Sequence, residues 1–150
     1  MWKLFCTVAA LFSLCESDLP FESMGVLTGI AQAKDGDGLL FGKVEIRLQG
    51  IAAPEFRANK KDPGGEAAYL ALEAKTGGQF VTCYLDGTRA AQRPVGVCAL
   101  DGKDLGLWLV RNGHALDCPA YSGGRYKEAE AAAKADGLDL SLIYELPDYC

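Results

Sequence analysis

The sequence predicts an α+β domain in which a small five-stranded barrel is accompanied by three helices. A length of 150 residues with 49% hydrophobic content suits one domain with one continuous core. Its 18 glycines and 6 prolines follow no fixed period, which favours short elements joined by many loops over a fibre or a solenoid. Alternating and helix-spaced apolar residues then locate the individual elements.

The first predicted strands lie between residues 24 and 48. Residues 24–33 suit a barrel strand with apolar side chains on both faces. A turn rich in glycine and aspartate follows at residues 34–38. Residues 39–41 and 43–48 predict a hairpin, because the second of these segments alternates apolar and polar residues.

A polar loop at residues 57–62 precedes a helix predicted over residues 66–75, which ends at a pair of glycines. Two antiparallel strands are predicted next, at residues 79–85 and 95–100, and a loop that begins with Asp86 joins them.

Two helices complete the predicted domain. One covers residues 104–112, and the other covers residues 122–136, with Ser122 as its cap. The order is therefore three strands, a helix, two strands and two helices. This order is typical of an α+β fold built on a barrel of the OB type.

The first fifteen residues have the features of a secretory signal peptide. Lys3 precedes an apolar run at residues 4–12, and small residues follow. The run is shorter than the roughly 20 apolar residues that span a bilayer. Acylation of Cys15 in a lipoprotein and a short buried helix are the alternatives. We expect an exported protein, periplasmic or extracellular, with no membrane segment in its mature form.

Four cysteines follow the predicted signal peptide, and four cysteines allow three pairings. Cys83 and Cys98 lie on the two predicted antiparallel strands on either side of one loop, so this pairing is favoured. Cys118 would then pair with Cys150. The chain has one histidine and no CxxC motif, which argues against a zinc site.

The formal net charge is −5, and removal of Lys3 with the signal peptide lowers it by one, to −6. Proteins that bind polyanions normally carry a basic field. Any contact with nucleic acid must therefore come from a local basic cluster.

Several motifs follow one another in order through the middle of the chain. They are Asp35-Gly36-Asp37, Arg47, the GIAAPE segment of residues 50–55, Arg93, and the LVRNG segment of residues 109–113. In this order and spacing the chain resembles the staphylococcal nuclease (thermonuclease-like) family. The resemblance implies a five-stranded OB-type barrel with three helices over residues 24–140, and leaves residues 141–150 as a tail.

The resemblance also implies chemical roles. Asp37 would bind calcium directly and Asp35 would support the ion through water, since calcium takes hard oxygen ligands. Arg47 and Arg93 would clamp the scissile phosphate, a task that suits the forked guanidinium group. Glu55 would orient or deprotonate the attacking water.

Further residues would bind the substrate, which is expected to be single-stranded DNA or RNA. Tyr121 would stack on a base, and Lys60 and Lys61 correspond to a basic loop near the family's site. A monomer is expected. Taken singly, each of these residues has a plainer interpretation as a surface charge, a turn or a loop. Their joint occurrence in order favours the nuclease interpretation.

The chain departs from the family pattern at several positions. Ala52 stands where the family usually has an aspartate that binds the metal, so calcium binding should weaken. Gly38, Pro94 and Pro119 also replace usual family residues. Two hypotheses follow: a calcium-dependent phosphodiesterase with a weakened metal site, or a non-catalytic OB module that binds nucleic acid or another partner.

Overall fold

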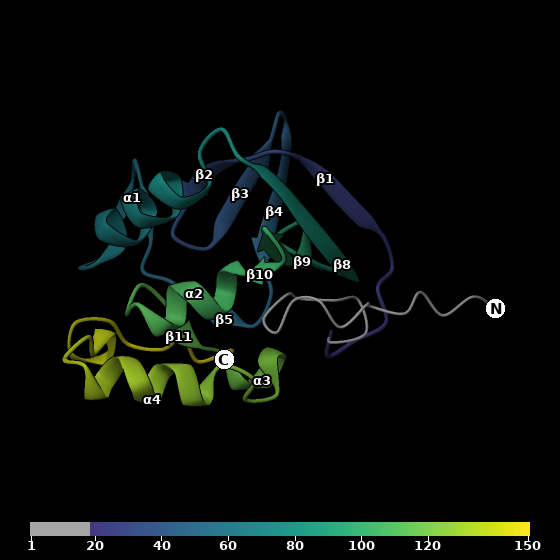
Figure 1. The fold of residues 1–150 in the computed structure, drawn as a ribbon. Helices are drawn as coiled ribbons and strands as arrows, with labels where there is room; N and C mark the ends of the chain where they lie inside the picture. Colours follow the sequence, from purple (N-terminus) through teal and green to yellow (C-terminus); the bar gives the residue numbers. More distant parts are fainter. Residues whose placement is uncertain (1–18) are drawn as a thin grey trace.

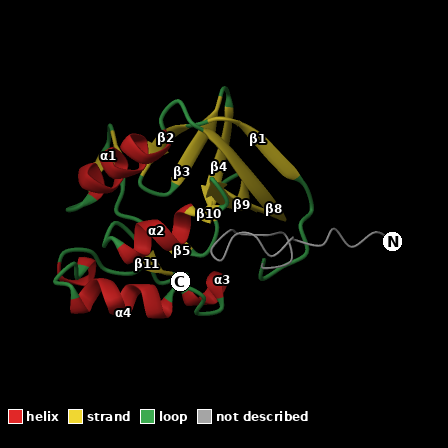
Figure 2. Cartoon of the chain, in the orientation of Figure 1, coloured by secondary structure: helices red, strands yellow, loops and turns green. Residues whose placement is uncertain are grey.

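The computed structural model describes residues 19–150, so the predicted signal peptide and Cys15 lie outside the described residues. The fold is α+β, as predicted. Figure 1 shows the long strands together in one half of the molecule and α2, α3 and α4 together in the other. Figure 2 shows the same separation of strands and helices, with α1 at the side of the sheet.

One mixed sheet contains most of the strands. Its hydrogen-bonded order is β1 (Val26–Ile30), β8 (Phe80–Ala90), β9 (Arg93–Leu100), β4 (Val44–Leu48), β3 (Gly38–Phe41) and β2 (Gln32–Asp35). All neighbours are antiparallel except β4 and β9, which are parallel. The short strand β10 (Lys103–Asp104) also pairs with β9.

The single strand predicted at residues 24–33 is in fact two strands with a bend at Ala31. Ala31 is buried, and its backbone does not pair with a neighbouring strand. Its N–H donates to the carbonyl of Gln79, and its carbonyl accepts from the N–H of Gly78, just after the end of α1. The bend sends β1 to one edge of the sheet and β2 to the other. The hydrogen-bonded path ends at these two edges rather than closing into a complete barrel.

Two short strand pairs lie outside this sheet. β5 (Ile51–Ala52) pairs with β11 (Leu116–Asp117), and β6 (Phe56–Arg57) pairs with β7 (Lys60–Lys61). The second pair shows that the polar loop predicted at residues 57–62 is instead part of a small hairpin.

The hairpin of β8 and β9 is longer than predicted. The pairing continues past Asp86 to Ala90, opposite Arg93. The turn consists of Ala91 and Gln92, both at positive φ (48° and 68°). Positive φ at both central residues is the geometry that matches the twist of a two-residue hairpin.

The helices are α1 (Gly65–Thr76), α2 (Leu105–Arg111), α3 (Pro119–Ser122) and α4 (Lys127–Ala135), followed by a 3₁₀ turn at Leu140–Leu142. The prediction of one helix over residues 122–136 is wrong. Ser122 ends α3, and Gly123 and Gly124 then adopt positive φ (66° and 82°), which stops the helix.

Both predicted disulfides are confirmed. Cys83 lies directly opposite Cys98 in the pairing of β8 with β9, and both are fully buried. Cys118 and Cys150 join the start of α3 to the end of the tail. Around the first disulfide, Leu39, Ile46 and Val81 from the sheet pack with buried side chains of α1 and α2. Within residues 19–150, no helix has the length and apolar character needed to cross a membrane.

Candidate functional site

Arg47 and Arg93 come from two neighbouring strands and face the same way. Arg47 of β4 lies opposite Val95 of β9, and Arg93 precedes Val95 by two residues. Side chains two residues apart on a strand point to the same face. Both arginines line one cavity of about 660 Å³, together with Gln49, Arg89, Tyr121 and Tyr149.

Arg93 is held at the edge of this cavity by two bonds. Its Nη1 lies 3.0 Å from Glu45 Oε1, and its Nε donates to the carbonyl of Ala90 at 3.1 Å. Glu45 precedes Arg47 by two residues on the strand parallel to β9, so the register places it beside Arg93. Within the described part of the chain, Nη2 of Arg93 has no partner, which leaves both of its N–H groups for an anion.

Arg47 is fixed more tightly than Arg93. Its guanidinium donates to the carbonyls of Asp37, Leu48 and Ile51, and its Nη1 also lies 2.9 Å from Asp37 Oδ2. Burial lowers the pKa of Arg47, but Asp37 and then Tyr149 raise it by more, so the net pKa is raised. Arg47 is therefore a permanent, rigidly oriented cation in the wall of the cavity.

Asp37 is the centre of a cluster of carboxylates behind Arg47. Its Oδ2 accepts from the N–H of Ala53 at 2.9 Å, and its own N–H donates to Asp35 Oδ1. Burial raises the pKa of Asp37 to about 6, and the charges of Asp35 and Glu55 add to the rise while Arg47 opposes it. The desolvated carboxylate therefore takes up a proton at a higher pH than an ordinary aspartate does.

Arg57 joins the other two carboxylates. Its Nε lies 2.8 Å from Glu55 Oε2, and its Nη2 lies 3.5 Å from Asp35 Oδ2. Asp62 fixes the backbone here, because its Oδ2 accepts from the N–H of Glu55. Arg47 thus pairs with Asp37, Arg57 pairs with both Asp35 and Glu55, and the N–H of Asp37 links the two groups by donating to Asp35.

The structure brings most of the predicted site residues together, but not all. Asp35, Asp37, Arg47 and Glu55 belong to one charged network, whereas Arg93 and Tyr121 lie at the cavity that Arg47 also lines. The exposed β7 carries Lys60 and Lys61 outside this cavity. Lys60 lies near Asp62, and Lys61 lies over the ring of Phe56.

Sequence reasoning missed Glu45, Arg57 and Tyr149. A signal for Glu45 was present, since it lies two residues before Arg47 on the same predicted strand. Arg57 lies two residues after Glu55, but the loop predicted there gave no basis for pairing them. Tyr149 had one signal only, its place next to a cysteine expected to form a disulfide.

The carboxylates do not fit a calcium ion in this arrangement. Calcium takes roughly six to eight oxygen ligands. Of the four carboxylate oxygens of Asp35 and Asp37, three already have a hydrogen-bond or ion-pair partner. Ala52 is buried and offers no oxygen from its side chain. Among residues 19–150, no group of three or more His, Cys, Asp or Glu side chains is arranged to hold a metal.

Comparison with known proteins finds a distant relative. No family model matches the chain. The chain is 28% identical over 127 residues to a protein named succinoglycan biosynthesis protein ExoI from Rhizobium meliloti (strain 1021). The similarity covers 76% of this chain and 64% of the relative, so the chain spans less than two thirds of that protein.

Proposed function

We propose that this chain is an exported, diverged member of the staphylococcal nuclease family that binds and hydrolyses phosphodiesters of single-stranded nucleic acid. The observation that carries the proposal is the pair Arg47 and Arg93, which line one cavity from adjacent strands. Two forked cations on one wall suit a phosphate group. The local basic cluster that an acidic chain needs is thus supplied by Arg47, Arg89 and Arg93.

Each charged residue has a task in this proposal. The N–H groups of Arg93 Nη2 donate to a non-bridging oxygen of the phosphate. Arg47 supplies a fixed positive charge that is strongest where negative charge grows in the pentacovalent transition state. We assign Glu55, which Arg57 orients outside the lining of the cavity, to accept the proton of the attacking water.

Calcium has no step in this proposed mechanism, because the carboxylates present do not fit the ion. Arg47 neutralises Asp37 directly, at the distance of a strong charge-assisted hydrogen bond. Calcium binding therefore remains a separate prediction, which depends on whether the network around Asp37 opens.

We also propose that the sheet is an opened form of an OB-type barrel. The strands at its two ends, β1 and β2, belong to one segment bent at Ala31. A bent strand shared by both edges is what a small barrel needs in order to close.

A non-catalytic binding module is the second candidate. Three ion pairs favour it, because each of Arg93, Asp37 and Glu55 already has a charged partner within the chain. The name of the relative adds succinoglycan biosynthesis as a setting in which such a module could act.

A cleavage assay separates the two candidates. Single-stranded DNA would be incubated with the mature protein in calcium and in chelator, beside Arg93→Ala and, as a matched control outside the cavity, Lys103→Ala. We expect cleavage by the wild type and by Lys103→Ala and at least a hundredfold loss in Arg93→Ala, in keeping with the loss of one transition-state donor. Binding without cleavage under both conditions would favour the non-catalytic module.

A further inference from the structure

The tail begins beside one end of the charged network. A methyl group in place of a Gly64 hydrogen would lie 3.2 Å from Leu140 Cδ1 and 3.4 Å from Ile143 Cδ1. It would also lie 3.5 Å from Pro54 Cγ. These side chains therefore gather over Gly64, and Pro54 directly precedes Glu55. The tail thus starts on the Glu55 side of the network.

The tail ends on the other side of the network, against Arg47. Tyr149 and Arg47 line the same cavity. After burial and Asp37, Tyr149 has the largest effect on the pKa of Arg47, so its phenol oxygen lies beside the guanidinium. Between the two ends, burial raises the pKa of the half-buried Tyr144, and the charge of Asp37 raises it further. The tail therefore passes over the ion pair of Asp37 and Arg47.

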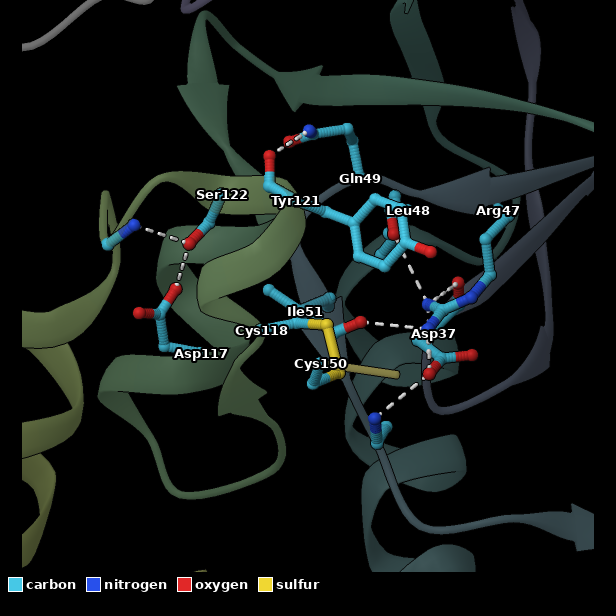
Figure 3. The surroundings of a disulfide bond; sticks show 12 residues. Asp37, Arg47, Leu48, Gln49, Ile51, Asp117, Cys118, Tyr121, Ser122 and Cys150 are labelled. Carbon is cyan, nitrogen blue, oxygen red and sulfur yellow. Dashed lines mark hydrogen bonds and ion pairs between the residues drawn. A yellow bond between two sulfur atoms is a disulfide. The ribbon is translucent and has the colours of Figure 1, made fainter. Parts of the chain in front are cut away.

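The Cys118–Cys150 disulfide fastens the end of the tail to the segment that holds Arg47. The N–H of Cys118 donates to the carbonyl of Gly50 at 2.9 Å. The carbonyl of the next residue, Ile51, accepts from Arg47 Nη2 at 2.8 Å. Figure 3 shows the disulfide beside Ile51, with Arg47 in its surroundings. The position of the tail over the site is thus fixed by a covalent bond.

Few other interactions hold the last part of the tail. Over residues 145–150, one backbone hydrogen bond joins the tail to the rest of the described chain, from the N–H of Ala120 to the carbonyl of Cys150. Glu145, Asp148 and Tyr149 are exposed. Because a segment with few buried contacts opens readily, the disulfide is the main restraint on this part of the chain.

Resting on the proposed function, we infer that residues 141–150 form a strap over the candidate site, which the Cys118–Cys150 disulfide holds closed and a dithiol reductant opens. The closed strap weakens the approach of a phosphate to Arg47 but does not seal the cavity, because 59% of Tyr149 remains exposed. The open strap leaves the ion pair of Asp37 and Arg47 accessible from that side.

Opening requires the transfer of two electrons from the reductant. A thiolate of the dithiol attacks Sγ of Cys150, and Cys118 leaves as a thiolate that takes up a proton. The second thiol of the reductant then attacks the mixed disulfide and displaces Cys150, which is protonated in turn. The reductant ends as a disulfide, and both cysteines end as thiols.

The two disulfides differ in their access to a reductant. Cys83 and Cys98 are fully buried between β8 and β9, whereas Cys150 is half-buried at the end of the chain. Because exchange depends on access to a sulfur atom, mild dithiothreitol should reduce Cys118–Cys150 alone. Alkylation followed by peptide mapping checks which cysteines have been reduced.

Modification by phenylglyoxal, which attacks accessible arginines, tests whether the strap covers the site. The mature protein would be compared in its oxidised form and after reduction and alkylation. We expect Arg47 to react at least about tenfold faster in the reduced form, as a closed-to-open ratio of that size requires. Arg111, which pairs with Asp136 outside the cavity, should react equally in both forms. An unchanged rate at Arg47 would overturn the strap.

Two variants control this comparison. Cys118→Ser/Cys150→Ser should match the reduced protein and should not respond to dithiothreitol. Leu142→Ala changes a highly exposed residue of the tail outside the cavity and should match wild type in both forms.

Titration calorimetry with inorganic phosphate separates the strap from the proposed function. We expect the reduced protein to bind phosphate about tenfold more tightly than the oxidised protein. Equal binding by the two forms would overturn the strap and leave the phosphate site intact. Faster modification of Arg47 without phosphate binding by either form would overturn the phosphate site and leave the strap.

Discussion

The guanidinium of Arg47 lies 2.9 Å from the carboxylate of Asp37, and the backbone ties the same two residues together. The carbonyl of Asp37 accepts from Arg47 Nη1 and from the N–H of Leu48. A residue expected to bind a metal and a residue expected to bind a phosphate therefore neutralise each other. This ion pair makes pH the first variable to test.

Asp37→Asn should change the pH dependence of stability. The pKa of Asp37 in the folded chain is raised to about 6, chiefly by burial, from an ordinary value of 3.8. The group therefore favours folding most below pH 4, and this contribution is lost as pH rises through 6. The free energy of unfolding of Asp37→Asn, minus that of wild type, should therefore rise by about 1 kcal/mol from pH 5 to pH 7.5.

Chemical denaturation in chelator at the two pH values measures this difference. Asn keeps the shape of the side chain and loses only its charge and titration. A stability difference between the two proteins that does not vary with pH would show that Asp37 has an ordinary pKa in the fold.

Arg47 and Arg93 should differ in their effect on stability, although the sequence alone treats them alike. Arg47→Ala breaks a mostly buried ion pair and removes the side-chain hydrogen bonds to three carbonyls, so we expect a loss of about 3 kcal/mol. Arg93→Ala breaks a more exposed pair with Glu45 and should cost about 1 kcal/mol or less. Thermal melts compare the two, with Arg47→Lys as a control that keeps the charge. Equal losses would contradict the different burial of the two side chains.

Ala52→Asp should make the stability of the chain depend on calcium. Residue 52 is buried and precedes Ala53, whose N–H binds Asp37. A new carboxylate there is desolvated and repelled by Asp37, so the variant should be less stable than wild type in chelator. Calcium should restore part of the loss, because each added anionic oxygen raises affinity for the ion.

Ala52→Asn provides the matched control, since it introduces similar volume without charge. Thermal melts of the three proteins with calcium and with chelator give the comparison. If calcium stabilises Ala52→Asp no more than Ala52→Asn, position 52 does not face a metal site.

The two disulfides should stabilise different parts of the chain. Cys83–Cys98 joins the centres of β8 and β9, whereas Cys118–Cys150 holds the tail against α3. Hydrogen exchange in Cys118→Ser/Cys150→Ser should speed up mainly in the tail and α3, because few backbone bonds other than that of Ala120 hold the tail there. Equally faster exchange in β8 and β9 would show that this disulfide supports the core.

The sequence predicts local pattern better than long-range contact here. Alternation in β4 places Arg47 on a polar face. The loop between β8 and β9 correctly predicts that Cys83 and Cys98 lie on neighbouring strands. The bend at Ala31 has no local signal, because the residue turns to bond the end of α1. Gly123 and Gly124 could have predicted the break before α4, but the run of alanines beyond them favoured one helix.

In the candidate site too, local pattern is predicted better than long-range contact. The motifs around Asp37, Arg47 and Glu55 bring those residues into one network. The partners Glu45 and Arg57 depend on strand register, and Tyr149 depends on a disulfide that returns the tail to the cavity. Such contacts are fixed by tertiary structure and leave no motif in the sequence.

A crystal structure of the mature protein with a bound single-stranded dinucleotide tests the central claim most directly. The claim is that the cavity lined by Arg47 and Arg93 binds a phosphodiester. We predict a phosphate within hydrogen-bond distance of Arg93 Nη2, on the side of the cavity that Arg47 lines. A dinucleotide bound elsewhere, with its phosphate away from both arginines, would contradict the claim.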